Sequence, residues 1–181
     1  MASTTARLMT VAEFDRLVEA EAFAQELHQG EVVRVTRPEL NHVFAQKCLV
    51  GLLDAAGAAG ATFTEVGFRP LPEYELRVAD VAWASRARWE QEDPGGHFRG
   101  VPDLVIEVLS PSNTAAEMLD KKTLCLANGA HEFWQVDLEH RVVEVSTSEG
   151  RVAIYGAGAA IPLFFAEEAT LAVDTIFSEA L

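Results

Sequence analysis

Residues 101–122 contain an acidic residue inside an apolar strand, and this limits the possible folds more than any other part of the chain. Asp103, which follows a proline, is typical of a strand entry. The apolar run at 104–109 is interrupted only by Glu107. A run that is apolar on both alternating faces predicts a central strand covered on both sides. A carboxylate buried there costs roughly 2–7 kcal/mol unless another group compensates it.

A helix with two adjacent lysines is predicted to follow this strand. A Ser-Pro-Ser segment ends the strand, and the helix is expected over about residues 113–128, before Gly129. Lys121 and Lys122 lie on this helix, and the chain has only three lysines. One of them is expected to face Glu107, because neighbours on a helix point ~100° apart. An ordinary helical pair of Lys121 with Glu117, worth ~0.2–0.5 kcal/mol, is the alternative.

The other segments predict a single α/β (α+β) domain over residues 1–181, without repeats or linkers. Helices are expected at about 11–20, after a capping box at Thr10 and Glu13, and from Pro38 to about Ala56. A hairpin is expected to turn at Gln29 and Gly30. The remaining strands are predicted at 62–69, 76–84, 132–137, 141–147 and 151–155, followed by a closing strand and a short helix at 171–181.

The composition limits the possible classes of protein. A hydrophobic fraction of 49% excludes wholesale disorder, and no apolar run reaches the ~18–20 residues of a membrane span. Cys48 and Cys125 are expected to be buried free thiols in a reducing cytoplasm. A net charge of −14 argues against a nucleic-acid coat protein. It does not exclude an enzyme that contacts phosphates through a metal.

Asp80 is a second acid inside a predicted strand. By the period of two it is expected to share a face with Val78 and Ala82. A structural ion pair with Arg77 or Arg69 is the alternative interpretation.

Asp80, Glu107 and a lysine are the groups left to carry chemistry. The chain has no phosphate-binding loop, no zinc-protease motif and no nucleophile elbow, and its five histidines do not cluster. Two ionised carboxylates in neighbouring strands suit a hard cation such as Mg²⁺. A metal there stabilises charge on a phosphodiester, and Lys121 or Lys122 could orient the attacking water.

Five segments resemble, in their order, the Uma-two type restriction endonucleases of the PD-(D/E)xK nuclease superfamily. They read ELHQGEVV, RVADVAW, PDLVIEVLSPS, the lysine helix with LANG, and HEFWQVD. The resemblance covers about residues 9–178. It implies the restriction-endonuclease-like fold, a mixed β-sheet flanked by helices. It also implies a Mg²⁺-dependent or Mn²⁺-dependent endonuclease that cleaves DNA.

The resemblance also implies roles for individual residues. Asp80 and Glu107 match the two acids that hold the metal, and the carbonyl of Val108 would add a third ligand. Lys121 matches the lysine that positions water, and it stands on the helix rather than in the strand. Glu26 matches a further acid of the site.

Three positions depart from the pattern of this family. Ala79 stands where proline is usual, Leu109 stands where the superfamily has its lysine, and Cys125 replaces a tyrosine. Glu26 also has alternatives, because it could be a solvent-facing strand residue, and Glu31 is a rival for its role.

A non-catalytic module of the same fold, acting as a dimeric scaffold or a DNA-binding partner, is the alternative function. A homodimer is expected in either case. The resemblance suggests it, because paired subunits of this fold often act on the two strands of DNA. The exposed edges expected for the hairpin at 132–147 would form the interface.

Overall fold

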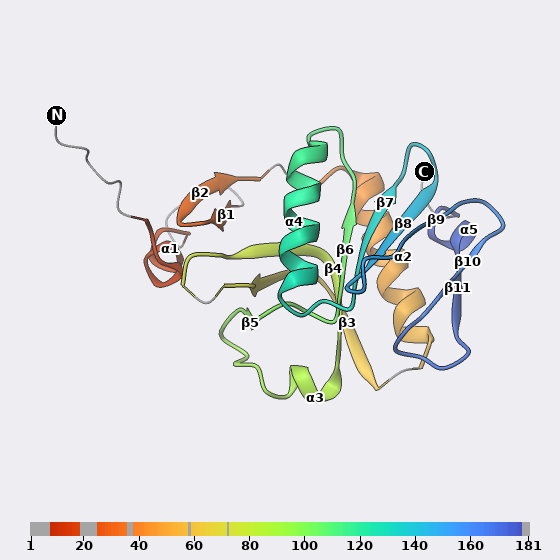
Figure 1. Cartoon of the computed structure of the whole chain (residues 1–181), viewed down its shortest axis with the longest axis horizontal. Coiled ribbons are helices and arrows are strands. Elements are labelled where there is room, and N and C mark those ends of the chain that lie inside the picture. Colours follow the sequence, from red (N-terminus) through yellow and green to blue (C-terminus); the bar gives the residue numbers. More distant parts are fainter. Residues whose placement is uncertain (1–7, 19–24, 36–37, 58, 72, 179–181) are drawn as a thin grey trace.

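A seven-stranded mixed sheet runs through the protein, and helices lie on both of its faces (Figure 1). The structure is a computed structural model that describes residues 8–18, 25–35, 38–57, 59–71 and 73–178. The strand order in the sheet is β5-β3-β4-β6-β7-β8-β9. Two small sheets, β1-β2 and β10-β11, flank it.

The helices are α1 (Val11–Val18), α2 (Leu40–Ala55), α3 (Arg86–Trp89), α4 (Ala115–Ala127) and α5 (Val173–Ile176). The strands are β1 (Gln25–His28), β2 (Glu31–Arg34), β3 (Gly60–Arg69), β4 (Arg77–Ser85), β5 (Phe98–Arg99), β6 (Leu104–Val108), β7 (Glu132–Asp137), β8 (Val142–Thr147), β9 (Val152–Tyr155), β10 (Ala160–Pro162) and β11 (Thr170–Ala172). Parts of three predicted elements lie outside the described residues: 19–20 of the first helix, 23–24 and 36 of the hairpin, and 179–181 of the closing segment.

Strand β6 is the central strand, as its apolar pattern predicts. It pairs antiparallel with β4 and parallel with β7, and all five of its residues are buried. Its side chains alternate between the two faces. Leu104, Ile106 and Val108 pack on the face covered by α2, whereas Val105 packs on the face covered by α4. Glu107 therefore points toward α4.

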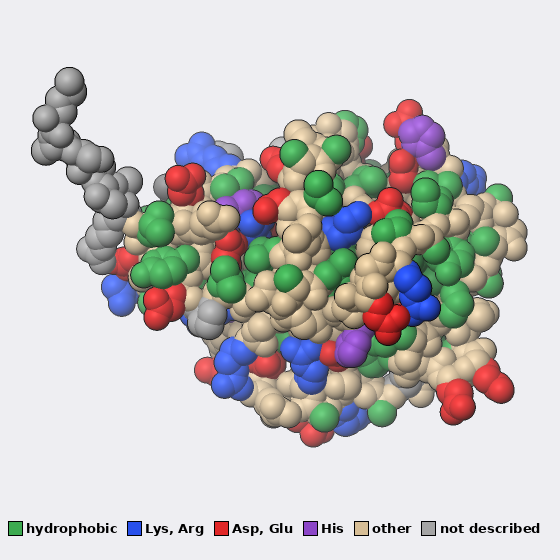
Figure 2. All heavy atoms as spheres, in the orientation of Figure 1, with side chains coloured by type: hydrophobic (Ala, Val, Ile, Leu, Met, Phe, Trp, Pro, Cys, Tyr) green, Lys and Arg blue, Asp and Glu red, His purple; other side chains and the backbone are tan. Residues whose placement is uncertain are grey.

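Helix α4 lies across one face of the sheet (Figure 1). It begins at a capping box, in which Thr114 caps the Glu117 backbone N–H and the Glu117 carboxylate accepts from Thr114. It ends before Gly129, whose φ of +121° suits glycine. Its buried residues are Met118, Lys121 and Cys125. Acidic, basic and hydrophobic side chains are interspersed over this side of the molecule (Figure 2).

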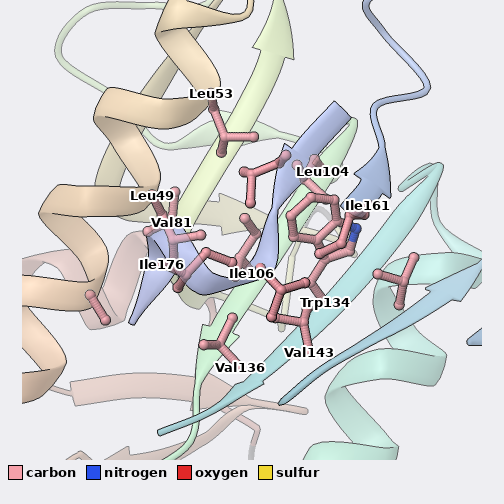
Figure 3. Packing of buried hydrophobic residues seen from close by; sticks show 14 of the residues in the cluster. Leu49, Leu53, Val81, Leu104, Ile106, Trp134, Val136, Val143, Ile161 and Ile176 are labelled. Carbon is pink, nitrogen blue, oxygen red and sulfur yellow. The ribbon is translucent and has the colours of Figure 1, made fainter. Parts of the chain in front are cut away.

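Helix α2 covers the opposite face and closes the larger hydrophobic core (Figure 3). Leu49 and Leu53 of α2 pack with Ile106 and Trp134 of the sheet, and the C-terminal segment adds Ile176. Burying each such side chain stabilises the fold by ~1.5–3 kcal/mol. The core thus holds α2 and β6 in fixed positions beside the polar groups at the end of β6.

The N-terminal hairpin reaches the sheet near the start of β4. It turns at Gln29 and Gly30, whose φ angles are +47° and +79°. Leu27 exchanges backbone hydrogen bonds with Leu76, just before β4. This contact, together with a small apolar cluster that includes Phe14, holds β1 against the sheet.

The strand order corrects the expected dimer edge. β7 pairs with β6 and β8, and β8 also pairs with β9, so both strands of the 132–147 hairpin lie inside the sheet. The expectation of free edges there is wrong, because the next strand covers them. β9 forms the edge, with Val152 and Ile154 exposed. In the part of the chain that the structure describes, no helix is long and apolar enough to cross a membrane.

Candidate active site

Lys121 and Glu107 form a buried ion pair between α4 and the central strand. The Lys121 Nζ donates to Glu107 Oε2 and to the Val78 carbonyl, both at 2.7 Å. Both residues are only 6% exposed. Lys122 instead pairs with Glu144 at 2.8 Å. The lysine that faces Glu107 is therefore Lys121, and its expected alternative, a simple helical pair with Glu117, is wrong.

Glu26 joins this pair from the hairpin. Its Oε1 lies 3.8 Å from the Lys121 Nζ and accepts the Val78 backbone N–H at 3.0 Å. Its Oε2 lies 2.6 Å from His28 Nε2. Glu26 is buried, so its interpretation as a solvent-facing residue is wrong. Glu31, the rival acid, is exposed on β2.

Asp80 lies where β4 and β6 separate. The pairing of these strands covers three residues of β4 and ends at Val81 and Ile106. Beyond this point the Asp80 carboxylate bridges the two strands, because its Oδ2 accepts the Val108 backbone N–H at 2.8 Å. The side chain is 21% exposed. The acid therefore lies at the surface end of the gap, close to the end of β6.

The interactions of Asp80 differ from two sequence-based expectations. Ala82 packs with Cys125 on the α4 face, whereas Asp80 contacts α2, so the expected shared face is wrong. The alternation breaks where Glu65, opposite Asp80 on β3, adopts a φ of +54° and leaves the pairing. Arg77 pairs with Glu75 and Asp120 instead of Asp80.

Two residues of α2 complete the surroundings of Asp80, and neither is among the predicted site residues. His42 Nε2 lies 3.1 Å from Asp80 Oδ1. The Gln46 amide donates to the same oxygen at 3.4 Å and to Glu65 at 2.6 Å. The signal in the sequence is their spacing of four residues, which places both on one helical face. That face points at Asp80 only because of the tertiary packing.

The charges of the cluster shift the pKa values of its members. Burial raises the pKa of Glu107 to about 8, opposed by Lys121 and supported by Asp80. Burial also raises the pKa of Glu26, but Lys121, His28 and a backbone N–H outweigh it and lower the value to about 2. Burial lowers the pKa of Lys121, but Glu107 and Glu26 raise it above its usual range. At neutral pH, Lys121 and Glu26 are therefore charged, whereas burial opposes the ionisation of Glu107 that its contact with Lys121 favours.

The donor set fits a hard cation at Asp80 and Glu107. The Glu107 Oε1 is buried and has no hydrogen-bond partner among the described residues. An oxygen with unused lone pairs in a covered site is what a divalent cation would coordinate. Within those same residues, no three His, Cys, Asp or Glu side chains are already grouped around one point. Two carboxylates with a backbone carbonyl and waters are a usual set for Mg²⁺.

The remaining positions singled out in the sequence have structural roles. Asp103 accepts from Arg88 at 2.5 Å and from the Ser85 backbone N–H at 3.0 Å, at the entry of β6. Cys125 lies one helical turn beyond Lys121, and burial raises the pKa of its thiol. It is a free thiol in the core, as expected, whereas Cys48 is only half-buried.

The raised pKa of Glu107 predicts a pH-dependent stability. A folded-state pKa of about 8 against 4.5 means that the native state binds more protons than the unfolded state between these values. The contribution of Glu107 to the free energy of unfolding is therefore greatest below pH 4.5. It falls by ~1.4 kcal/mol for each pH unit as pH rises toward 8. Denaturant unfolding in EDTA should show Glu107→Gln gaining stability relative to wild type from pH 5 to 9. Glu31→Gln is the exposed control, and a difference that does not vary with pH would contradict the assignment.

Comparisons with known proteins identify the family and the fold. The model of the Uma2 family, described as "putative restriction endonuclease", matches residues 11–174. A crystal structure of a putative nuclease belonging to DUF820 from Anabaena variabilis ATCC 29413 superposes with a TM-score of 0.80 and 22% identity. The match covers 96% of this chain and 99% of that one, and it shows the expected fold. Among curated proteins, no sequence matches. The chain belongs to the Uma2 family.

Proposed function

We propose that the protein is a divalent-metal-dependent endonuclease that hydrolyses phosphodiester bonds in DNA. The observation that carries this proposal is the buried Lys121–Glu107 pair, with Asp80 at the adjoining gap between β4 and β6. Buried charge clusters of this kind are costly to maintain and gather at functional sites. Membership of the Uma2 family supports the same class of reaction.

The roles follow from the environment of each group. Asp80 and Glu107 would hold Mg²⁺ or Mn²⁺, with the Val108 carbonyl as a further ligand. Such a cation, when bound, supplies positive charge that stabilises the phosphate as it becomes more negative in the transition state. It would also favour the ionised form of Glu107, whose proton is released on binding.

Lys121 acts as a hydrogen-bond donor in this scheme. Its raised pKa keeps it an ammonium, so it cannot take a proton from the attacking water. It can orient that water, or a phosphate oxygen, with the N–H that is not used by Glu107 and Val78. Glu26, ionised at neutral pH, maintains the charge on Lys121.

A non-catalytic module of the same fold is the second candidate. The net charge of −14 favours it, because a negative surface repels DNA. A buried ion pair that is already formed is also compatible with a purely structural cluster. In that case the DNA contact would be absent or would come from a partner. The buried thiol of Cys125 fits a cytoplasmic location for either function.

Metal binding separates the two candidates. Mn²⁺ or Mg²⁺ should raise the melting temperature of the wild type, because a ligand at 100 times its Kd adds ~2.7 kcal/mol to stability. It should also support nicking of supercoiled DNA. Asp80→Asn with Glu107→Gln should lose both effects, whereas Asp120→Asn, at an exposed acid beside the site, should keep both. An unchanged metal response in the double variant would reject the site.

Lys121 and Lys122 provide a matched pair of substitutions. Lys121→Met should lower metal-dependent cleavage by at least ~100-fold, as loss of a positioned catalytic group does. Lys122→Met removes only the contact with Glu144 and should cleave like the wild type. Lys121→Met also leaves Glu26 and Glu107 without their counter-charge, so melting curves must establish that it is folded at the assay temperature. Equal cleavage by the two folded variants would remove Lys121 from the mechanism.

We also propose a homodimer that pairs through the edge strand β9. This edge strand exposes Val152 at 58% and Ile154 at 68%, which suits pairing with a second copy. Light scattering at micromolar concentration should give twice 19.7 kDa, and Ile154→Lys should shift the protein toward monomer. A wild type that scatters as a monomer under these conditions would argue against the dimer.

A further inference from the structure

We propose that the groove between α2 and β3 binds the DNA strand next to the bond that is cut, and that Lys47 contacts a phosphate of that strand. This inference rests on the proposed function, whose site it extends. The groove has a volume of about 350 Å³. Val43, Lys47 and Val50 of α2 line one side, and Thr62 and Phe63 of β3 line the other.

The groove opens directly at the candidate active site. Gln46 forms part of its wall, and the Gln46 amide lies 3.4 Å from Asp80 Oδ1. Glu65 holds the same amide at 2.6 Å, which fixes its orientation. A strand with one phosphodiester at Asp80 would therefore continue into the groove past Gln46 toward Lys47.

Lys47 is the lysine that remains available for a phosphate. Lys121 is paired with Glu107, and Lys122 with Glu144. Among the residues that the structure describes, Lys47 has no acidic partner, and it is exposed. The candidate site is rich in acids, so a polyanion needs positive charge along its path. A lysine on the wall of the adjoining groove supplies it.

The other lining residues suit the remaining parts of a nucleotide. Phe63 is 50% exposed, and its ring packs edge-on against Trp89 at 4.9 Å, which limits its motion. An exposed, oriented ring is a surface on which a base or sugar can pack. The Thr62 hydroxyl is buried without a hydrogen-bond partner within the described part of the chain. It can bond a polar atom of an occupant of the groove.

The backbone of β3 is also accessible beside the groove. In the described sheet, β5 pairs only with Phe68 and Arg69 of β3. The stretch 60–67 therefore has β4 on one side and no strand on the other. The Thr62 N–H on this edge already donates to Asp54 Oδ1 at 3.1 Å. Other backbone N–H groups on such an edge can contact phosphate oxygens without reading sequence. The groove thus predicts contacts that are independent of DNA sequence.

Binding of a fluorescein-labelled DNA duplex, followed by anisotropy in EDTA over a range of salt concentrations, tests this inference. Lys47→Ala should weaken binding several-fold at low salt and reduce the salt slope by about 1, because one phosphate contact is lost. Phe63→Leu should weaken binding without changing the slope. Lys122→Ala, a lysine paired on the α4 side, should match the wild type. In cleavage assays with Mg²⁺, Lys47→Ala should raise KM and leave kcat unchanged.

The outcomes distinguish this inference from the proposed function. A wild type that cleaves DNA, with Lys47→Ala identical to it in affinity, salt slope and KM, would overturn the groove alone. A wild type that binds DNA through Lys47 but never cleaves it would overturn the proposed reaction and leave the groove. Absence of DNA binding by the wild type, or binding that is insensitive to salt, would reject the groove as a DNA site.

Discussion

The site and much of its surroundings depend on the contacts that the Lys121 ammonium makes. It contacts three oxygens that come from different elements: Glu107 of β6, the Val78 carbonyl of β4 and Glu26 of β1. Helix α4, two sheet strands and the N-terminal hairpin therefore meet at one nitrogen. A buried ion pair gains little net stability over apolar residues of the same volume, whereas loss of one partner costs ~3–5 kcal/mol. A costly cluster at this junction is better explained by chemistry than by folding alone.

The sheet itself creates the position for Asp80. If β4 and β6 remained paired to their ends, the Val108 N–H would bond a backbone carbonyl. Because the pairing stops at Val81 and Ile106, Asp80 accepts that N–H and lies between the strands. Glu107 points to the α4 side, and Asp80 contacts α2. The two acids therefore lie near the end of β6 with their side chains on opposite faces of the sheet. Asp80 has this position because the regular alternation of β4 is broken there.

The sequence predicted what local patterns encode. The apolar run with Glu107 identified the central strand, and the capping box at Thr10 starts a helix where the structure has one. Resemblance to the family selected Lys121 over Lys122, and the structure places Lys121 at Glu107. The contacts of Asp80 with His42 and Gln46 were missed, because they depend on how α2 packs on the sheet. The hairpin edge was wrong for a similar reason, since a later strand, β9, covers β8.

In the proposed function, Glu107 is a metal ligand, and binding of the cation shifts its buried carboxyl toward the ionised form. Calorimetric titration with Mn²⁺ at pH 7, in two buffers with different enthalpies of ionisation, measures the protons released on binding. Because burial raises the pKa of Glu107, the wild type should release more protons per cation bound than Glu107→Gln does. Absence of binding, or binding to the wild type without proton release, would contradict the account.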